Sequence, residues 1–504
     1  MKKNILILLL DGCRAQSLGC YGYTVRDTSP NVDALAERGL VAQKNYATSF
    51  CTMPSIVSMM TGLYPCVHKA TATWGYYDGA FPFLTDILRA NGYQTFGVSN
   101  NIAAMSPEWG FVRGYDRYYR VGKEENWFKA SKEEQRGVRK AKLKTRIQRS
   151  LFEMFKKRAP ELSDEVRRRA SITHFESHDM GGNKAVESFE LALKERDKEK
   201  PFFGYVNLPD THAPFTTINP FAKTWGKLDY SDNLLKLFFN SSEFYEDGLD
   251  LTQEDIAVLQ ASYDTCVRYV DHLVGRIVQI LHDSKLFENT VLLLLGDHGG
   301  MTYEKKQLYG GASFTYEPEI RVPFIIVDHG LGRQTDRLTS VVDVFPTIHD
   351  LAGIEMLSDS LCHGKSVFQS NAGHSEVVID YPAYPDWLSR TVVKWPETLI
   401  RYGKTNRTMV TAAGEKIIWV NNGQHERYDL GQDPLENHNL FSGREEDFVL
   451  IKKMQDKYQQ LLGSKGAYLE YYPHNDIGEE SLLLPPLQVV NPEFNPESIR
   501  LIER

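Results

Sequence analysis

Three apolar runs that end in acidic or imidazole residues constrain the fold of this chain most. Each run leads into a short polar stretch: residues 4–10 into Asp11, residues 201–208 into Asp210 and His212, and residues 291–295 into Asp297 and His298. Continuous apolar runs are typical of strands buried on both faces of a parallel sheet. Ligand sites in open α/β sheets lie at the carboxyl ends of such strands, so these polar residues are candidates for a site. We therefore predict an α/β fold with a doubly wound mixed sheet flanked by helices.

Other segments fit the remaining strands and helices of such a fold. Apolar runs predict strands at residues 40–46, 94–98 and 321–327, and helical patterns cover residues 28–35, 81–91, 257–281 and 341–352. After about residue 375 the pattern changes to short strands at 376–379, 408–411, 416–420 and 427–430, with a helix at 445–462. We predict a smaller antiparallel α+β subdomain there.

The length of 504 residues suits one large domain and a smaller one. We place a catalytic α/β domain at residues 1–375 and the C-terminal subdomain with a tail at 376–504. Within the large domain, apolar side chains recur every four positions among many lysines and arginines, which predicts a helical basic insertion at residues 123–185. The insertion fits a solvated helix packed on the domain, a lid, an oligomer contact or a guide for an anionic substrate.

Charge, hydropathy and cysteine spacing exclude several classes of protein. The net charge of −8 and the pI near 6.0 argue against a nucleic-acid partner. The N-terminal MKKNILILLLDG has the start of a signal peptide, but its apolar run is too short to span a bilayer and lacks a small-residue cleavage site. We expect no membrane span elsewhere. The six cysteines lack metal-type spacing, so we expect reduced thiols and a cytoplasmic protein.

The stretch from Ala47 to His68 places a hydroxyl at the start of a helix. Thr52 lies two residues before Pro54, and an apolar run continues to Thr61. Proline suits a first helical turn, and the unpaired N–H groups and dipole at a helix start favour a tetrahedral oxyanion such as phosphate or sulfate. Thr52 is therefore a candidate nucleophile, although a threonine in this position can equally be a helix cap.

Several segments together carry a family resemblance. In chain order they are NILILLLDGCRAQSLGCYGY, TSPNVDAL, TMPS, TGLYP, GDHGG, IRVPFIIV, VVDVFPTIHDLAGI and RYDLGQDPLENHNL. They resemble the sulfatase family of the alkaline phosphatase superfamily, and the resemblance spans nearly the whole chain in the family's order. It implies an alkaline-phosphatase-like fold, a hydrolase acting on ester bonds and a small anionic ester as substrate. A homo-oligomer remains open.

The resemblance implies one bound divalent cation. Its ligands would be Asp11, Asp297 and His298, with the Thr52 hydroxyl as the fourth ligand and nucleophile. Many sulfatases have an amide at the histidine position, which suits calcium, whereas an imidazole favours manganese or zinc.

Two further residues receive catalytic roles from the resemblance. His212 lies in DTHAPF, similar to the family's D-x-H-x-P-Y loop, and would contact the transferring group or protonate the leaving oxygen. Asn100 stands where sulfatases commonly have a lysine and would donate a hydrogen bond to an oxyanion; a turn asparagine is the alternative. A second cation held by Asp210, His212 and His363 is a weaker alternative.

The sequence departs from the family pattern around its nucleophile. Sulfatases use C/S-x-P-x-R, in which the Cys or Ser becomes formylglycine, whereas this chain has Thr52 at that position and Ile56 at the arginine position. Cys51 lies one position too early, and Gly12 replaces a second aspartate. We therefore expect no formylglycine.

A threonine changes the chemistry that the site can perform. It cannot expel sulfate by forming an aldehyde, so water must cleave the covalent ester at its central atom, a reaction better suited to phosphorus. We therefore favour phosphate or phosphonate (di)esters as substrates. A true sulfate-ester sulfatase, a phospho-head-group transferase and a non-catalytic binding module remain as alternatives. Lys305 and Lys306 are either surface residues or contacts for a substrate anion.

Overall fold

A computed structural model gives the arrangement of the chain. It describes residues 2–70, 81–101, 105, 110–121, 179–213, 215, 220–226, 228–239, 250–306, 315–327, 333–356, 362–369, 373–381, 406–420 and 423–463. Most of the basic insertion and the C-terminal tail therefore lie outside the described residues.

An eight-stranded mixed sheet forms the centre of the large domain. Its strands are β1 (Asn4–Leu10), β2 (Leu40–Tyr46), β3 (Gln94–Ser99), β4 (Arg117–Arg120), β5 (Phe202–Leu208), β6 (Thr290–Leu295), β7 (Phe324–Val327) and β8 (Arg333–Ser340). Their order is β4-β3-β5-β1-β6-β7-β2-β8, and β7 runs antiparallel to both of its neighbours. The predicted mixed sheet is confirmed.

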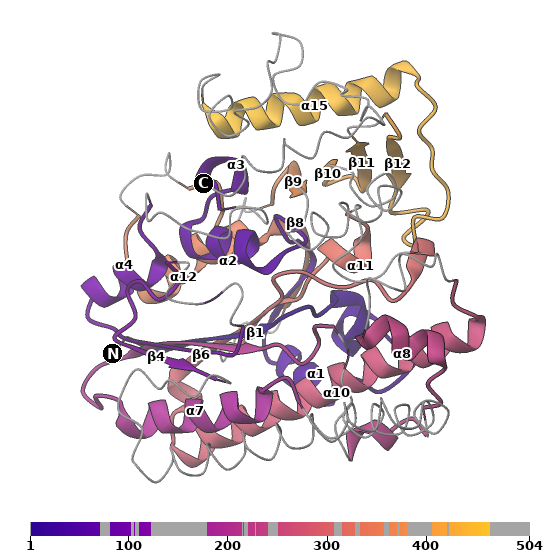
Figure 1. Cartoon of the computed structure of the whole chain (residues 1–504). Coiled ribbons are helices and arrows are strands. Elements are labelled where there is room, and N and C mark those ends of the chain that lie inside the picture. The colour runs from indigo at the N-terminus through magenta and orange to yellow at the C-terminus, as the bar shows by residue number, and fades with distance from the viewer. Residues whose placement is uncertain are drawn as a thin grey trace, which may run out of the picture.

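Helices cover both faces of this sheet, as Figure 1 shows. One face carries α1 (Pro30–Ala36), α7 (Gly182–Glu195), α8 (Asp232–Phe239) and α10 (Gln253–Asp283), and the other carries α2 (Thr52–Thr61), α4 (Leu84–Ala90) and α12 (Val344–Ala352). Shorter helices are η1 (Ala15–Ser17), η2 (Gly19–Tyr21), α3 (Pro65–His68), η4 (Phe221–Lys223), η5 (Phe287–Asn289), η6 (Glu304–Lys306), α11 (Glu317–Ile320) and η7 (Val341–Asp343).

The central position of β1 explains its unbroken apolar sequence. Leu6, Leu8 and Leu10 belong to the core under α10, whereas Ile5 and Ile7 belong to the core under α2. Alternate side chains of a strand point to opposite faces, so a strand covered on both faces needs apolar residues at every position. Its carboxyl end is thereby fixed between β5 and β6.

The C-terminal subdomain is an antiparallel sheet with one long helix. Its strands are β9 (Glu376–Tyr381), β10 (Asn406–Thr411), β11 (Glu415–Val420) and β12 (Glu426–Asp429), in the order β12-β11-β10-β9. Helix α15 (Glu445–Leu462) lies over this sheet (Figure 1). It buries Leu450, Met454 and Tyr458 in the core between them. The predicted antiparallel subdomain is confirmed.

Some elements differ from the sequence prediction. Strands β4 and β8 were not expected because they are edge strands with several exposed or half-buried side chains, and their sequences RYYR and RQTDRLTS carry no apolar run. Helix α4 begins at Leu84 rather than Phe81, and the Asp86 carboxylate accepts a hydrogen bond from Phe83 N–H at its start. In the described part of the chain, no helix is long and apolar enough to cross a bilayer.

Candidate active site

Asp11 is fixed at the carboxyl end of β1. Its backbone N–H donates to Leu208 O (3.1 Å), and its carbonyl accepts a hydrogen bond from Thr211 Oγ1 (2.6 Å). The side chain is fully buried. The end of β5 therefore holds the backbone that presents this carboxylate.

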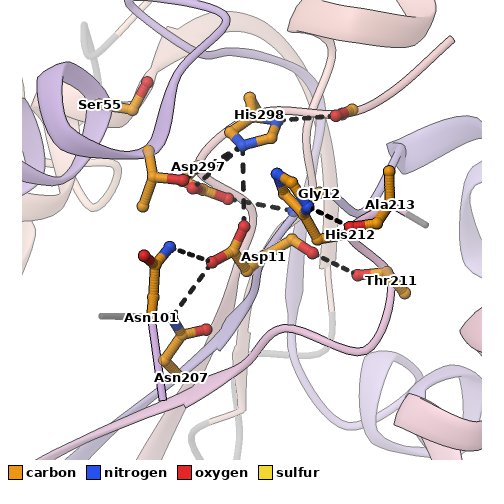
Figure 2. Close-up of polar contacts among 12 residues, drawn as sticks. Asp11, Gly12, Ser55, Asn101, Asn207, Thr211, His212, Ala213, Asp297 and His298 are labelled. Atoms are coloured by element: carbon orange, nitrogen blue, oxygen red, sulfur yellow. Dashed lines mark hydrogen bonds and ion pairs between the residues drawn. The ribbon is translucent and has the colours of Figure 1, made fainter. Parts of the chain in front are cut away.

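Asp297 and His298 follow β6 and reach the same place, as Figure 2 shows. His298 Nε2 lies 3.7 Å from Asp11 Oδ1 and 3.6 Å from Asp297 Oδ2. Asp297 Oδ1 accepts a hydrogen bond from Gly12 N–H (3.3 Å). The structure thus brings Asp11 together with two adjacent residues that follow it by almost 300 positions in the sequence.

The backbone at Gly12 explains why glycine follows Asp11. Its φ is +77°, and a Cβ at this position would lie 3.1 Å from His212 Cα. A side chain here would be strained in its backbone and crowded by the loop that carries His212. A second carboxylate at this position would therefore strain the observed turn and press on the loop of His212.

Thr52 is the first residue of α2, as the sequence predicts for a helix start. Its Oγ1 lies 3.2 Å from His298 Nε2, and its hydroxyl also interacts with the Asp297 carboxylate. The whole helix is buried, so the loop before it cannot shift without disturbing the core. The hydroxyl is held against the Asp297 carboxylate and the His298 imidazole.

His212 and His298 present the same ring nitrogen to this centre. The Nδ1 atom of each ring lies within hydrogen-bond distance of the carbonyl of the next residue, 2.8 Å to Ala213 O and 2.7 Å to Gly299 O (Figure 2). The ring centroids are 5.6 Å apart, at 81° to each other. A donor Nδ1–H leaves Nε2 as the lone-pair nitrogen, which is the arrangement of a metal-binding or proton-transferring histidine.

The residues present fit a divalent cation. Asp11, His212 and His298 each offer a ligand atom within 4.8 Å of the others. Asp11 Oδ1 and Asp297 Oδ2 are buried and have no hydrogen-bond partner among the described residues. Buried anionic oxygens are costly unless a cation or a donor satisfies them, so this set of oxygen and imidazole groups suits a divalent cation.

The pKa shifts describe the same concentration of negative charge. Burial and the nearby Asp11 carboxylate raise the pKa of Asp297 to about 6. Burial would lower the pKa of His298, but the charges of Asp297 and Asp11 outweigh burial and raise it. Without a cation, Asp297 and His298 therefore bind protons more tightly than the isolated side chains do, because of burial and the nearby negative charge.

Sequence reasoning missed two amides that hold Asp11. The side-chain nitrogens of Asn101 and Asn207 donate to Asp11 Oδ2, at 3.0 and 3.1 Å (Figure 2). With Oδ2 engaged by two donors, Oδ1 is the oxygen turned toward His298. The sequence does mark Asn207 as unusual, because it is a polar residue within the apolar run FFGYVNL.

Asn100 lies differently from its neighbour Asn101. A Cβ built on Gly181 would come within 2.7 Å of Asn100 Nδ2, so this amide packs against the start of α7. The contact with Asp11 belongs to Asn101. The oxyanion contact predicted for Asn100 stays a prediction.

Glu319 is a buried acid beside the site that the sequence did not single out. It lies in α11, whose Pro318 and Glu319 carbonyls accept hydrogen bonds from Gly300 and Gly299 N–H. Burial raises the pKa of Glu319 to about 7, although the positive charge of His298 opposes that shift. The signal was hidden because Glu319 stands in a short polar helix rather than after a strand.

The remaining candidates contact other parts of the molecule. Lys305 Nζ donates to Glu436 O in the C-terminal subdomain. Asp210 accepts a hydrogen bond from Met180 N–H before α7, and His363 Nδ1 accepts one from Tyr64 N–H. Among the described residues, neither Asp210 nor His363 belongs to the cluster of potential metal ligands around Asp11.

Substitution of each of the two neighbouring asparagines by alanine separates their roles. We expect Asn101→Ala to weaken divalent-cation affinity about 10- to 100-fold, because Asp11 loses a donor that orients it. Asn100→Ala should leave that affinity unchanged, since its amide packs against Gly181. Calorimetric titration of both variants with manganese and zinc measures the difference. Equal losses in the two variants would contradict the assignment.

Comparison with known proteins shows which family the chain matches. The family model described as Sulfatase matches residues 3–354. An arylsulfatase of Clostridium perfringens is 22% identical over 499 residues, covering 91% of this chain and 95% of its own. A phosphonate monoester hydrolase of Agrobacterium radiobacter has a similar structure, with a TM-score of 0.64 and 19% identity over 92% of this chain and 96% of its own. A phosphonate monoester hydrolase of Silicibacter pomeroyi gives a TM-score of 0.63 and 16% identity over 91% and 95%.

Proposed function

The chain belongs to the sulfatase family of ester hydrolases, and from that premise we propose that it cleaves phosphonate monoesters or phosphodiesters through a covalent intermediate on Thr52. The observation that supports this most is the position of Thr52 Oγ1, 3.2 Å from His298 Nε2 and beside the Asp297 carboxylate. A hydroxyl in this place is a nucleophile that the surrounding groups can activate.

The proposal includes one divalent cation held by Asp11, Asp297, His298 and the Thr52 hydroxyl. Enzymes of the family use a divalent metal, and the unpartnered carboxylate oxygens support its place here. When bound, the cation supplies positive charge that stabilises the ionised threonine and a non-bridging oxygen of the substrate. The imidazole ligand favours manganese or zinc over calcium.

The protein's own groups account for both halves of the reaction. The ionised Thr52 Oγ1 forms a bond to the central atom while the bond to the ester oxygen breaks, and protonated His212 gives its Nε2 proton to that oxygen. Water then attacks the central atom, neutral His212 takes the water's proton, and the bond to Thr52 Oγ1 breaks, which returns Thr52 to its ionised form. Because Nδ1 of His212 is engaged with Ala213 O, Nε2 is the nitrogen that carries the proton in each step.

Thr52 itself favours phosphorus over sulfur. A threonyl ester can be released only by a second attack at the central atom, which phosphoryl groups undergo readily. The two phosphonate monoester hydrolases with a similar fold make this substrate class a natural test, although their similarity to this chain shows only the fold.

A side-by-side assay tests the substrate class. We expect kcat/KM for para-nitrophenyl phenylphosphonate and for a para-nitrophenyl phosphodiester to exceed that for para-nitrophenyl sulfate by about 100-fold, on the order of 3 kcal/mol of barrier. Release of nitrophenolate by the manganese- or zinc-loaded protein gives the three values. A preference for the sulfate would support a sulfate-ester sulfatase, and transfer product in the presence of glycerol would support a head-group transferase.

A further inference from the structure

The loop that precedes Thr52 joins the two sheets of the molecule. At its start, Ala47 N–H donates to Ile320 O (2.8 Å), next to the central sheet. Its next two residues, Thr48 and Ser49, pair with β9, which is an edge strand of the four-stranded sheet. Asp380 N–H donates to Thr48 O (2.9 Å), and Ser49 Oγ donates to Asp380 O (3.0 Å).

An aromatic pair adds to this attachment. The rings of Phe50 and Tyr381 stack with centroids 4.1 Å apart and planes 22° from parallel, and each residue is at most 3% exposed. A buried stack of this kind resists displacement, because separating the rings would expose both or leave a cavity. Phe50 is two residues before Thr52, so little chain remains to absorb a shift.

The partner residue in β9 is itself fixed from behind. Asp380 Oδ1 accepts a hydrogen bond from Tyr458 of α15 (2.5 Å) and lies 3.6 Å from Arg407 Nε of β10. The guanidinium of Arg407 also lies over the Tyr458 ring, 5.0 Å from its centroid. These side chains are almost fully buried, so α15, β10 and β9 form one rigid support.

We infer that the C-terminal subdomain helps to form the catalytic site. Its residues Asp380 and Tyr381 hold the loop of residues 47–51, here called the nucleophile loop, and thereby position Thr52 Oγ1. The inference rests on the proposed role of Thr52. Tyr381 is a positioning residue and does not touch the reacting atoms. A displacement of about 1 Å at a reacting group can cost about 100-fold in rate, so a loosened loop should lower kcat.

Variants of Tyr381 test the inference in the metal-loaded full chain with para-nitrophenyl phenylphosphonate. We expect Tyr381→Leu to lower kcat about 10- to 100-fold, while KM and metal affinity change by less than about threefold. Tyr381→Phe keeps the stack and should restore kcat to near the wild-type value. Ser49→Ala, a milder change that removes one hydrogen bond to Asp380, should lower kcat without lowering the unfolding temperature appreciably.

Trp419→Leu is the matched control. Trp419 is a buried aromatic residue of β11 that stacks on His425 and packs in the core beneath α15. It should destabilise the same small sheet yet leave kcat unchanged. If Tyr381→Leu and Trp419→Leu lower activity equally, in proportion to the unfolded fraction, the role of Tyr381 is structural and the inference is overturned.

Thr52→Ala, assayed in parallel, separates this inference from the function on which it rests. Turnover retained in Thr52→Ala overturns the proposed function and the inference with it. Loss of turnover in Thr52→Ala with normal kcat in both Tyr381→Leu and Ser49→Ala overturns the inference alone.

Discussion

Replacement of Thr52 by alanine should reduce ester cleavage by about 10⁴-fold or more, because no other described hydroxyl lies beside both His298 and Asp297. The substitution removes a hydroxyl and one methyl group at the start of a helix whose other residues keep their packing, so we expect the fold to be retained. Initial rates with the metal-loaded protein measure the loss, and a thermal unfolding curve checks the fold.

Thr52→Ser and Cys51→Ala give the matched controls. Serine keeps the hydroxyl and should retain part of the activity, whereas Cys51 should be dispensable, because burial and the charges of Glu319 and Asp297 raise its thiol pKa well above the usual value. Near-normal turnover in Thr52→Ala would refute the nucleophile. A mass increase trapped on Thr52 during turnover would identify the covalent ester directly.

The strands that form the site were predictable because burial on both faces leaves a clear pattern. A strand such as β1, with every residue buried, is apolar along almost its whole length, and the first polar residue after its apolar run marks the sheet edge. The predicted ends of β1 at Leu10 and β6 at Leu295 coincide with the observed ends. Edge strand β8 has polar residues instead, so no apolar run marked it.

The contacts around the metal ligands were harder to predict, because they depend on how loops turn. Asn100 and Asn101 are adjacent in the sequence, yet the first packs on Gly181 and the second donates to Asp11. The spacing of these residues in the sequence does not show which way each side chain points after the turn. Glu319 was missed for the same reason, since its place beside His298 arises from the packing of a short helix on a glycine turn.

Removal of the divalent cation should abolish ester cleavage. We expect chelation to lower turnover about a thousandfold or more, which corresponds to several kcal/mol of charge stabilisation, and added manganese or zinc to restore it. Asp11→Asn should behave like the chelated protein, because it removes a charge from the centre of the cluster. Full activity after exhaustive chelation, verified by elemental analysis, would contradict the metal-dependent mechanism.

We also expect the stability of the chelated protein to vary with pH because of Asp297. Its pKa rises from 3.8 in the unfolded chain to about 6 in the fold, so the folded state binds the proton more tightly. Asp297 therefore destabilises the metal-free fold once it ionises, with no cost below pH 3.8, a growing cost up to about pH 6 and a constant cost above. Metal-free Asp297→Asn should accordingly be more stable than the wild type at pH 8, by on the order of 2 kcal/mol, and equal to it near pH 4.

Metal should reverse this order. At pH 8 the wild-type carboxylate binds the cation and gains stability from it, whereas the amide of Asp297→Asn binds the cation weakly and gains little. Urea unfolding of both proteins at pH 4, 6 and 8, with chelator and with saturating manganese, measures the stability difference between them under each condition. An advantage of Asp297→Asn that is greatest at pH 4, or that survives saturating metal at pH 8, would show that the Asp297 carboxylate is not a ligand. The same buried carboxylate would thus weaken the metal-free fold and strengthen the metal-bound one, because only a cation offsets its repulsion with Asp11.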